Sequence, residues 1–314
     1  MKELEIGPNE AGQRLDKYLK KLLPRAQSSF FYKMLRKKNI VRNGKKAEGS
    51  VQLCVGDRIT LYLSDETIIK FSSDKISGNI QGQERIASLP ALEILYEDAD
   101  ILVINKPSGL LSQKAAPSDI SANELVLQYL LESGAVTPKM LETFRPSVCN
   151  RLDRNTSGIL IAGKTLRGLQ QMSEQLRERT VKKYYRCVAA GSIKERQHLR
   201  GFLCKDHKTN KVGIHSSDGQ YIETEYEPLG YANGCTLLEV HLITGRSHQI
   251  RAHLASVGHP LVGDTKYGDP AVNKKFRNEI GLRHQLLHAC RIVLADGQEI
   301  VAPLPEAFSR FDFV

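Results

Sequence analysis

The chain has 314 residues, a net charge of +10 and 41% hydrophobic residues, a composition typical of a soluble globular protein with room for two domains. No apolar run approaches the roughly 20 residues that a membrane-spanning helix requires, and residues 1–5 lack a secretory signal pattern. The six cysteines form no close pair, which favours reduced thiols over a disulfide framework or a zinc site. We therefore expect a cytoplasmic, monomeric protein without a membrane partner.

Positive charge is concentrated in residues 14–46. This segment holds twelve Lys or Arg residues and one acid, Asp16, a net charge of +11, so the remainder is nearly neutral. Such a concentration is typical of a module that binds a polyanion, although a charge run can also be a solvated face. The candidate RNA-contacting residues are Arg14, Lys17, Lys33, Arg36, Lys37, Arg42 and Lys45.

The same region has the pattern of a small α/β domain over residues 1–66. Asn43-Gly44 indicates a tight hairpin turn. The apolar patterns predict helices over 15–23 and 28–37 and strands over 51–55 and 59–63.

A polar segment over residues 67–90 predicts a linker, and residues 91–314 form a second predicted domain. Its strand-like and helical runs do not alternate regularly, which predicts an α+β fold rather than a parallel βαβ fold. The predicted strands cover 92–96, 101–104, 181–190 and 237–242, and the predicted helices begin at 121, 166 and 247.

Asp153 lies among turn-forming residues between Arg151 and Arg154, directly before the apolar run 159–162. A carboxylate on a tight loop beside a rigid strand is well placed to act as a nucleophile. A solvated turn would have much the same sequence, so this segment alone leaves both interpretations open.

A second cluster follows the strand at 237–242, where a glycine turn leads into a helix. Arg246 and His248 lie at the start of that helix, a position that suits an anion. His248, His253 and His259 are spaced five and six residues apart, which argues against a metal site. With no glycine-rich phosphate loop or serine-hydrolase elbow in the sequence, we expect no cofactor.

A third cluster is a strand that carries adjacent tyrosines, Tyr184 and Tyr185. Neighbouring side chains on a strand point to opposite faces, so only one of the two can face a given cleft. Either tyrosine could simply pack in the core, or one could stack on a nucleobase.

Together the three clusters resemble the RluA-type RNA pseudouridine synthases over about residues 92–308. The resemblance implies a mixed, largely antiparallel sheet in the catalytic domain. Residues 10–63 resemble the S-four-type RNA-binding domain first seen in a ribosomal small-subunit protein. The residues that match this small domain are Arg14 to Leu19 and Val41 to Lys45. The motifs that match the synthase family are Arg151-Leu152-Asp153, Thr156-Ser157-Gly158, Lys183-x-Tyr185, Thr244 to Arg251, Gly258 to Leu261, Gly263-Asp264, Tyr267-Gly268, Leu287-His288-Ala289 and Pro303-Leu304-Pro305.

The resemblance also implies roles for individual residues. Asp153 corresponds to the catalytic aspartate, Tyr185 to the active-site tyrosine, and Arg246 to the basic partner of the aspartate. One departure is Asn150, where many members have His. The implied substrate-binding residues are Arg151, Leu287, His248 and Arg251.

The activity implied in this way is isomerisation of uridine to pseudouridine in RNA, with large-subunit ribosomal RNA as the favoured substrate. The same chemistry on transfer RNA and a non-catalytic ribosome-assembly role are the alternatives. An aspartate-dependent phosphohydrolase would require an acidic metal-binding cluster, which the sequence does not contain.

Overall fold

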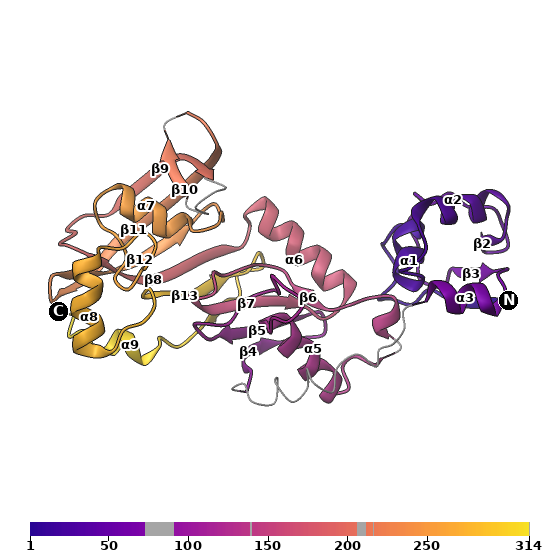
Figure 1. The fold of residues 1–314 in the computed structure, drawn as a ribbon, viewed down its shortest axis with the longest axis horizontal. Helices are drawn as coiled ribbons and strands as arrows, with labels where there is room; N and C mark the ends of the chain where they lie inside the picture. Colours follow the sequence, from indigo (N-terminus) through magenta and orange to yellow (C-terminus); the bar gives the residue numbers. More distant parts are fainter. Residues whose placement is uncertain (73–90, 139, 206–211, 216, 314) are drawn as a thin grey trace.

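The computed structural model describes residues 1–72, 91–138, 140–205, 212–215 and 217–313. Figure 1 shows a small N-terminal module and a larger domain built on one long sheet. The two are joined by side-chain contacts: Thr143 donates a hydrogen bond to Glu10 at 2.6 Å, and Gln170 donates to the Gly12 carbonyl at 3.4 Å. No helix in these ranges has the length and hydropathy to cross a membrane.

The N-terminal module packs helices against a three-stranded antiparallel sheet of order β1-β3-β2. Tyr18, Leu19 and Phe31 supply large buried side chains to its core. Its elements are β1 (Lys2–Glu5), α1 (Leu15–Leu22), α2 (Ser28–Arg36), β2 (Ile40–Arg42), β3 (Arg58–Leu61) and α3 (Asp65–Phe71).

The two helices and the hairpin turn of this module agree with the sequence prediction, and Asn43 and Gly44 both have positive φ, 51° and 71°. The predicted strand over 51–55 is absent. Its alternating pattern instead reflects an irregular segment that buries Leu53 and exposes Val55.

The expected domain boundary at residue 66 falls inside α3. The ring of Phe71 lies 4.7 Å from that of Phe30, so α3 packs on α2 and the module continues to the end of α3. The first part of the expected linker is therefore helical. The rest of that segment, residues 73–90, lies outside the described residues.

The described part of the larger domain starts at residue 91. Its elements are β4 (Glu93–Glu97), β5 (Ile101–Lys106), α5 (Ala122–Glu132), η1 (Met140–Glu142), β6 (Ser147–Val148), β7 (Ser157–Gly163), α6 (Leu166–Glu178), β8 (Lys182–Ala190), β9 (Gln197–Lys205), β10 (Val212–His215), β11 (Gln220–Ala232), β12 (Cys235–Leu242), α7 (Gln249–Ser256), α8 (Pro270–Ile280), β13 (Leu287–Val293), β14 (Glu299–Val301) and α9 (Glu306–Ser309).

The strands form one sheet in the order β10-β9-β11-β12-β8-β13-β7-β5-β4, with β14 beside β13 and β6 beside β7. Among the described strand pairs, β7 and β13 are parallel and the others are antiparallel. This arrangement confirms the predicted α+β class. In Figure 1, α6 covers one face near β7, and α7 lies over the end of the sheet formed by β9 to β11.

The centre of the sheet is a rigid apolar platform. β7 lies between β5 and β13, and every one of its residues is buried, as expected for a central strand of a sheet that is covered on both faces. Gly158, at φ 107°, lets β7 approach β13 closely, because a side chain there would collide with the Ala289 backbone. The residues just before β7 are therefore fixed relative to β13 and β8.

Candidate active site

The loop that carries Asp153 lies between β6 and β7 and is fastened to the sheet by hydrogen bonds. Ser112 Oγ accepts from the Leu152 amide and donates to the Leu152 carbonyl, both at 2.9 Å. The Thr156 amide donates to the Asp153 carbonyl at 3.1 Å and closes the turn. The Asp153 side chain, 23% exposed, is consequently presented on a well-fixed backbone.

Lys106, the last residue of β5, joins the Asp153 loop to the segment that follows β5. Its side chain is fully buried, and Nζ donates to the carbonyls of Pro107, Leu110 and Arg154 at 3.0, 2.7 and 3.1 Å. Burial lowers the pKa of this amine to about 7, and the negative charge of Asp153 opposes that shift. Lys106 is not among the site residues predicted from the sequence, although a lysine at the end of an apolar strand was a usable signal.

The structure accounts for Asn150. Its amide oxygen accepts from the Ile161 amide at 2.8 Å, and its nitrogen donates to the Ile159 carbonyl at 3.4 Å. The side chain therefore mimics a neighbouring strand and ties the loop to β7.

The partner of Asp153 is Arg251, and the prediction of Arg246 for this position is wrong. Arg251 Nη1 donates to Asp153 Oδ2 at 2.8 Å from a guanidinium that is 8% exposed. Burial alone would lower the pKa of Arg251, but hydrogen bonds to Asp264 and Asp153 raise it above its usual range, so the side chain remains charged. The contact places a positively charged group directly beside Asp153 Oδ2.

Arg246 is exposed, and among the described residues no acidic side chain lies within ion-pairing distance of it. The reason is local geometry. His248 adopts a left-handed conformation, φ 57°, and α7 begins only at Gln249. Arg246 thus remains in the turn, whereas Arg251 falls on the buried face of the first helical turn.

Gln249 fixes the start of α7. Its amide oxygen accepts from Thr244 Oγ1 at 2.8 Å and from the Arg246 amide at 3.0 Å. Its nitrogen donates to the Glu223 carbonyl and to Thr224 Oγ1, both at 3.0 Å. This buried network locks α7 onto β11, and with it the backbone that carries Arg251.

Asp264 holds the other side of the Arg251 guanidinium. Arg251 Nε and Nη2 donate to the two Asp264 oxygens at 2.7 and 2.8 Å, and Asp264 is fully buried. Burial alone would raise the pKa of Asp264, but the hydrogen bonds and charge of Arg251 hold it below its usual range. Gly263-Asp264 is one of the motifs that match the family, but the sequence alone predicted no role for Asp264.

His248 and Tyr267 complete the surroundings of Asp153. His248 Nε2 lies 3.9 Å from Asp153 Oδ2, and His248 Nδ1 lies 2.9 Å from the Tyr267 hydroxyl. The Tyr267 hydroxyl accepts the Val212 amide at 2.9 Å, and its ring centroid lies 5.2 Å from the Arg251 guanidinium carbon. Burial lowers the pKa of His248, which favours the neutral ring.

The structure separates the two adjacent tyrosines. Tyr185 is 7% exposed, and its pKa is raised by burial first and by the nearby charge of Asp153 second. Tyr184 lies between the His241 ring, at 4.9 Å, and the Arg291 guanidinium, at 3.8 Å from the ring centroid. Tyr185, two strands from β7 across β13, is therefore the tyrosine on the Asp153 side.

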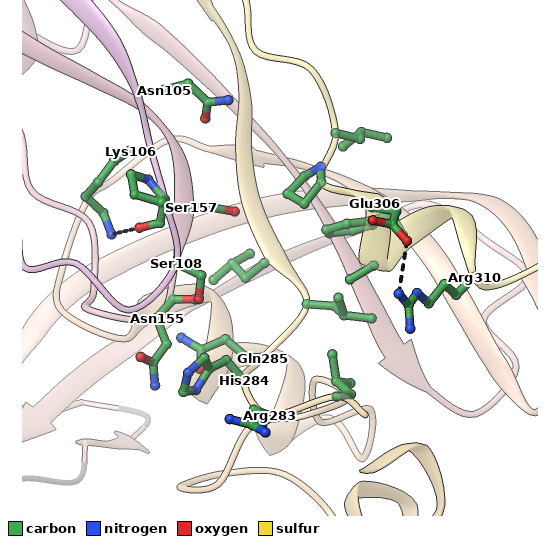
Figure 2. A pocket seen from close by; sticks show the side chains of 18 of the residues that line it. Asn105, Lys106, Ser108, Asn155, Ser157, Arg283, His284, Gln285, Glu306 and Arg310 are labelled. Carbon is green, nitrogen blue, oxygen red and sulfur yellow. Dashed lines mark hydrogen bonds and ion pairs between the residues drawn. The ribbon is translucent and has the colours of Figure 1, made fainter. Parts of the chain in front are cut away.

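A cavity of about 680 Å³ borders the end of the Asp153 loop at Asn155. Figure 2 shows Ser108, Asn155, His284 and Gln285 close together in its lining. Leu287 also lines this cavity, but Asp153, Tyr185 and Arg251 are not among its lining residues. The expectation that Leu287 forms an apolar wall beside the base remains a prediction.

The predicted RNA-contacting residues differ in how they are engaged. Arg14 pairs with Asp16 at 2.6 Å, and Arg42 pairs with the buried Asp57 at 2.7 Å, so each is already neutralised by an acid. Arg14 is nevertheless exposed, as are Lys17, Lys33, Arg36, Lys37 and Lys45, for which no ion pair with a described residue is found. Arg151, two residues before Asp153, is exposed as well.

Within the described ranges, no group of three or more His, Cys, Asp or Glu residues could hold a metal ion. The residues around Asp153 form a cluster of carboxylate, guanidinium, imidazole and phenol groups. Such a set can stabilise an anion, bind a planar base and supply a nucleophilic oxygen.

Comparison with known proteins agrees with this geometry. The model of the family described as RNA pseudouridylate synthase matches residues 100–256. Ribosomal large subunit pseudouridine synthase C of Rickettsia bellii is 31% identical over 95% of this chain and 96% of its own length. Ribosomal large subunit pseudouridine synthase D of Neisseria meningitidis is 31% identical over 94% of this chain and 77% of its own length.

A solved structure of human RNA pseudouridylate synthase domain containing 4 has the same fold, with a TM-score of 0.57 and 23% identity over 73% of this chain and 94% of its own. The family match and the two relatives together cover both the site and nearly the whole chain. The chain therefore belongs to the RluA-type RNA pseudouridine synthases, isomerases that convert uridine in RNA to pseudouridine.

Proposed function

We propose that this enzyme modifies uridine in large-subunit ribosomal RNA and that Asp153 is its catalytic carboxylate. The observation that carries the proposal is the ion pair between Asp153 and Arg251 on a loop fixed against the central strand β7. Both bacterial relatives are ribosomal large subunit pseudouridine synthases, which supports ribosomal RNA as the substrate class. A monomeric state and a cytoplasmic location belong to the same proposal.

The reaction breaks the bond between uracil N1 and the ribose and rejoins the base through C5. Asp153 Oδ2 is engaged by Arg251, whereas Oδ1 accepts no hydrogen bond from the described residues. Oδ1 is the oxygen available to the substrate, either at the anomeric carbon of the sugar or at C6 of the base. C5 then loses its proton and N1 gains one, so the reaction is a net isomerisation in which nothing is oxidised or reduced.

Tyr185 serves in this proposal as a platform for the uracil ring. A raised pKa keeps its hydroxyl protonated near neutral pH, so a tyrosinate base is disfavoured while stacking is unaffected. The target uridine must leave its helix to reach the site, which costs a few kcal/mol of lost stacking and pairing.

The N-terminal module supplies phosphate contacts. Its exposed lysines and arginines are suited to a salt-dependent, sequence-independent attraction to RNA. Its contacts with Thr143 and Gln170 connect this electrostatic anchor to the catalytic domain.

The test is to map pseudouridine in ribosomal and transfer RNA from cells with and without the gene. We expect one or more large-subunit positions to lose pseudouridine and to regain it with the wild-type gene but not with Asp153→Ala. Asp296→Ala, which removes an exposed turn carboxylate, should restore modification.

If the deletion strain instead loses a pseudouridine in transfer RNA, the substrate is transfer RNA. Full restoration of pseudouridine by Asp153→Ala would show that Asp153 is not the catalytic carboxylate. Unchanged RNA in the deletion strain would favour the non-catalytic role.

A further inference from the structure

We propose that Asp264 is a positioning residue that keeps one oxygen of Asp153 open to substrate. It does so by accepting the two hydrogen bonds that Nε and Nη2 of the Arg251 guanidinium donate along one edge. The inference rests on the proposed role of Asp153 as the catalytic carboxylate.

The donors of Arg251 are divided unequally between the two carboxylates. The edge formed by Nε and Nη2, which matches a carboxylate with two parallel hydrogen bonds, faces Asp264 at 2.7 and 2.8 Å. Asp153 receives one bond, from Nη1 to Oδ2 at 2.8 Å. Asp153 is thus stabilised as an anion through one oxygen, while the other oxygen remains unengaged by described residues.

Asp264 is rigid enough to enforce this division. It is fully buried, and its Oδ1 also accepts the amides of Lys266 and Tyr267 at 2.8 and 3.1 Å. Its carbonyl accepts from Asn273 Nδ2 at 2.8 Å and from the Gly268 amide at 2.9 Å. Neither the side chain nor the backbone of Asp264 can follow the guanidinium if Arg251 moves.

The charges of the three side chains explain why the sharing of Arg251 donors between Asp264 and Asp153 affects the nucleophile. One guanidinium lies between two carboxylates, so the cluster carries a net charge of −1. The fully buried Asp264 has its hydrogen bonds satisfied, and Asp153 is the partly exposed member, at 23%. Without Asp264, the flat guanidinium would be available for a two-bond pair with Asp153, which would engage both oxygens and shield the nucleophile.

The experiment measures single-turnover conversion of an unmodified large-subunit rRNA transcript by wild type and Asp264→Asn. The asparagine keeps the size of the side chain but cannot offer Arg251 two acceptor oxygens. We expect the rate at saturating RNA to fall by about 10- to 100-fold, with the half-saturating RNA concentration changed less than about threefold.

The matched control is Asp100→Asn. Asp100 also holds an arginine by two donors, Nε and Nη2 of Arg167, but at the start of α6, away from the site. Its loss should leave the single-turnover rate unchanged, so a general effect of breaking an Asp–Arg pair is separated from positioning.

A second comparison covers the case in which Asp264→Asn folds poorly. Arg251→Met and the double variant Asp264→Asn/Arg251→Met remove the guanidinium, so no buried cation is left unpaired in the double variant. If Asp264 acts through Arg251, the two variants have the same residual rate.

A folded Asp264→Asn with a rate within threefold of wild type would overturn the inference, as would a further drop in the double variant relative to Arg251→Met. Asp153→Ala in the same assay distinguishes the two levels of proposal. Activity without the Asp153 carboxylate refutes the catalytic assignment, whereas an inactive Asp153→Ala beside a fully active Asp264→Asn refutes only the positioning role.

Discussion

Arg251 and Asp153 are 98 residues apart in the sequence and form a 2.8 Å ion pair between Nη1 and Oδ2. The pair joins the loop before β7 to the first turn of α7. Both residues are held by their surroundings, Asp153 through its loop and Arg251 through Asp264 and the Gln249 network. This prearranged pairing is what an electrostatically organised active site requires.

The first prediction compares the two arginines of the same turn. Arg251→Met should lower the single-turnover rate by about 100-fold or more, because it removes the cation that pairs with Asp153. Arg246→Met should lower it less than tenfold, since Arg246 is exposed and does not reach Asp153. Rates at saturating RNA measure both effects, and equal losses would contradict the assignment of Arg251.

The second prediction concerns Tyr185. Tyr185→Phe retains the ring and should keep more activity than Tyr185→Leu, which loses stacking worth about 1–3 kcal/mol. Tyr184→Leu is the matched control, because Tyr184 is held between His241 and Arg291. A Phe variant as inactive as the Leu variant would show that the hydroxyl takes part in the chemistry.

The third prediction addresses the basic module. Replacing Lys33, Arg36 and Lys37 with Gln removes three exposed charges from the region of α2. If all three contact phosphates, the slope of log affinity against log salt should become shallower by about 2–3 units. The same number of exposed charges on α8, replaced as Lys274→Gln/Lys275→Gln/Arg277→Gln, should change it less.

Filter-binding titrations at several salt concentrations give both slopes. If the α8 variant changes the slope more than the α2 variant does, the main phosphate contacts lie outside the N-terminal module.

The fourth prediction is a loss of stability in acid. Burial lowers the pKa of His253 and His288 to about 4, whereas an unfolded histidine titrates near pH 6.5. Between those values the unfolded state binds more protons, so stability falls as pH falls from about 6.5 to about 4 and then levels off. Each histidine accounts for a loss of about 3 kcal/mol.

Urea unfolding at pH 7.5 and 4.5 measures this loss. His288→Asn should lose less stability than wild type over the interval, while His284→Asn, at an exposed position, should behave as wild type. An unchanged acid response in His288→Asn would exclude His288 as a source of the pH dependence.

Local patterns alone determined much of the fold. Periodicity identified α1, α2, α6 and the strands β7, β8 and β12, because the spacing of buried side chains within one element is written in consecutive residues. The Asn43-Gly44 turn and the capping box at Ser121 and Glu124 were also predictable, since each depends on neighbouring residues. Local patterns also drew attention to the Asp153 turn and to the strand with Tyr184 and Tyr185. The choice of Asp153 as the catalytic residue and of Tyr185 over Tyr184 came from the family resemblance.

The tertiary structure decided which groups meet Asp153. Arg246 and Arg251 are both basic residues near the start of one helix, and their roles depend on where α7 begins and which face it buries. Lys106 and Asp264 reach the site from β5 and from the turn after α7, through contacts that no short window of sequence contains. Secondary structure is set by nearest neighbours, whereas the charge balance around Asp153 is set by distant segments that packing brings together.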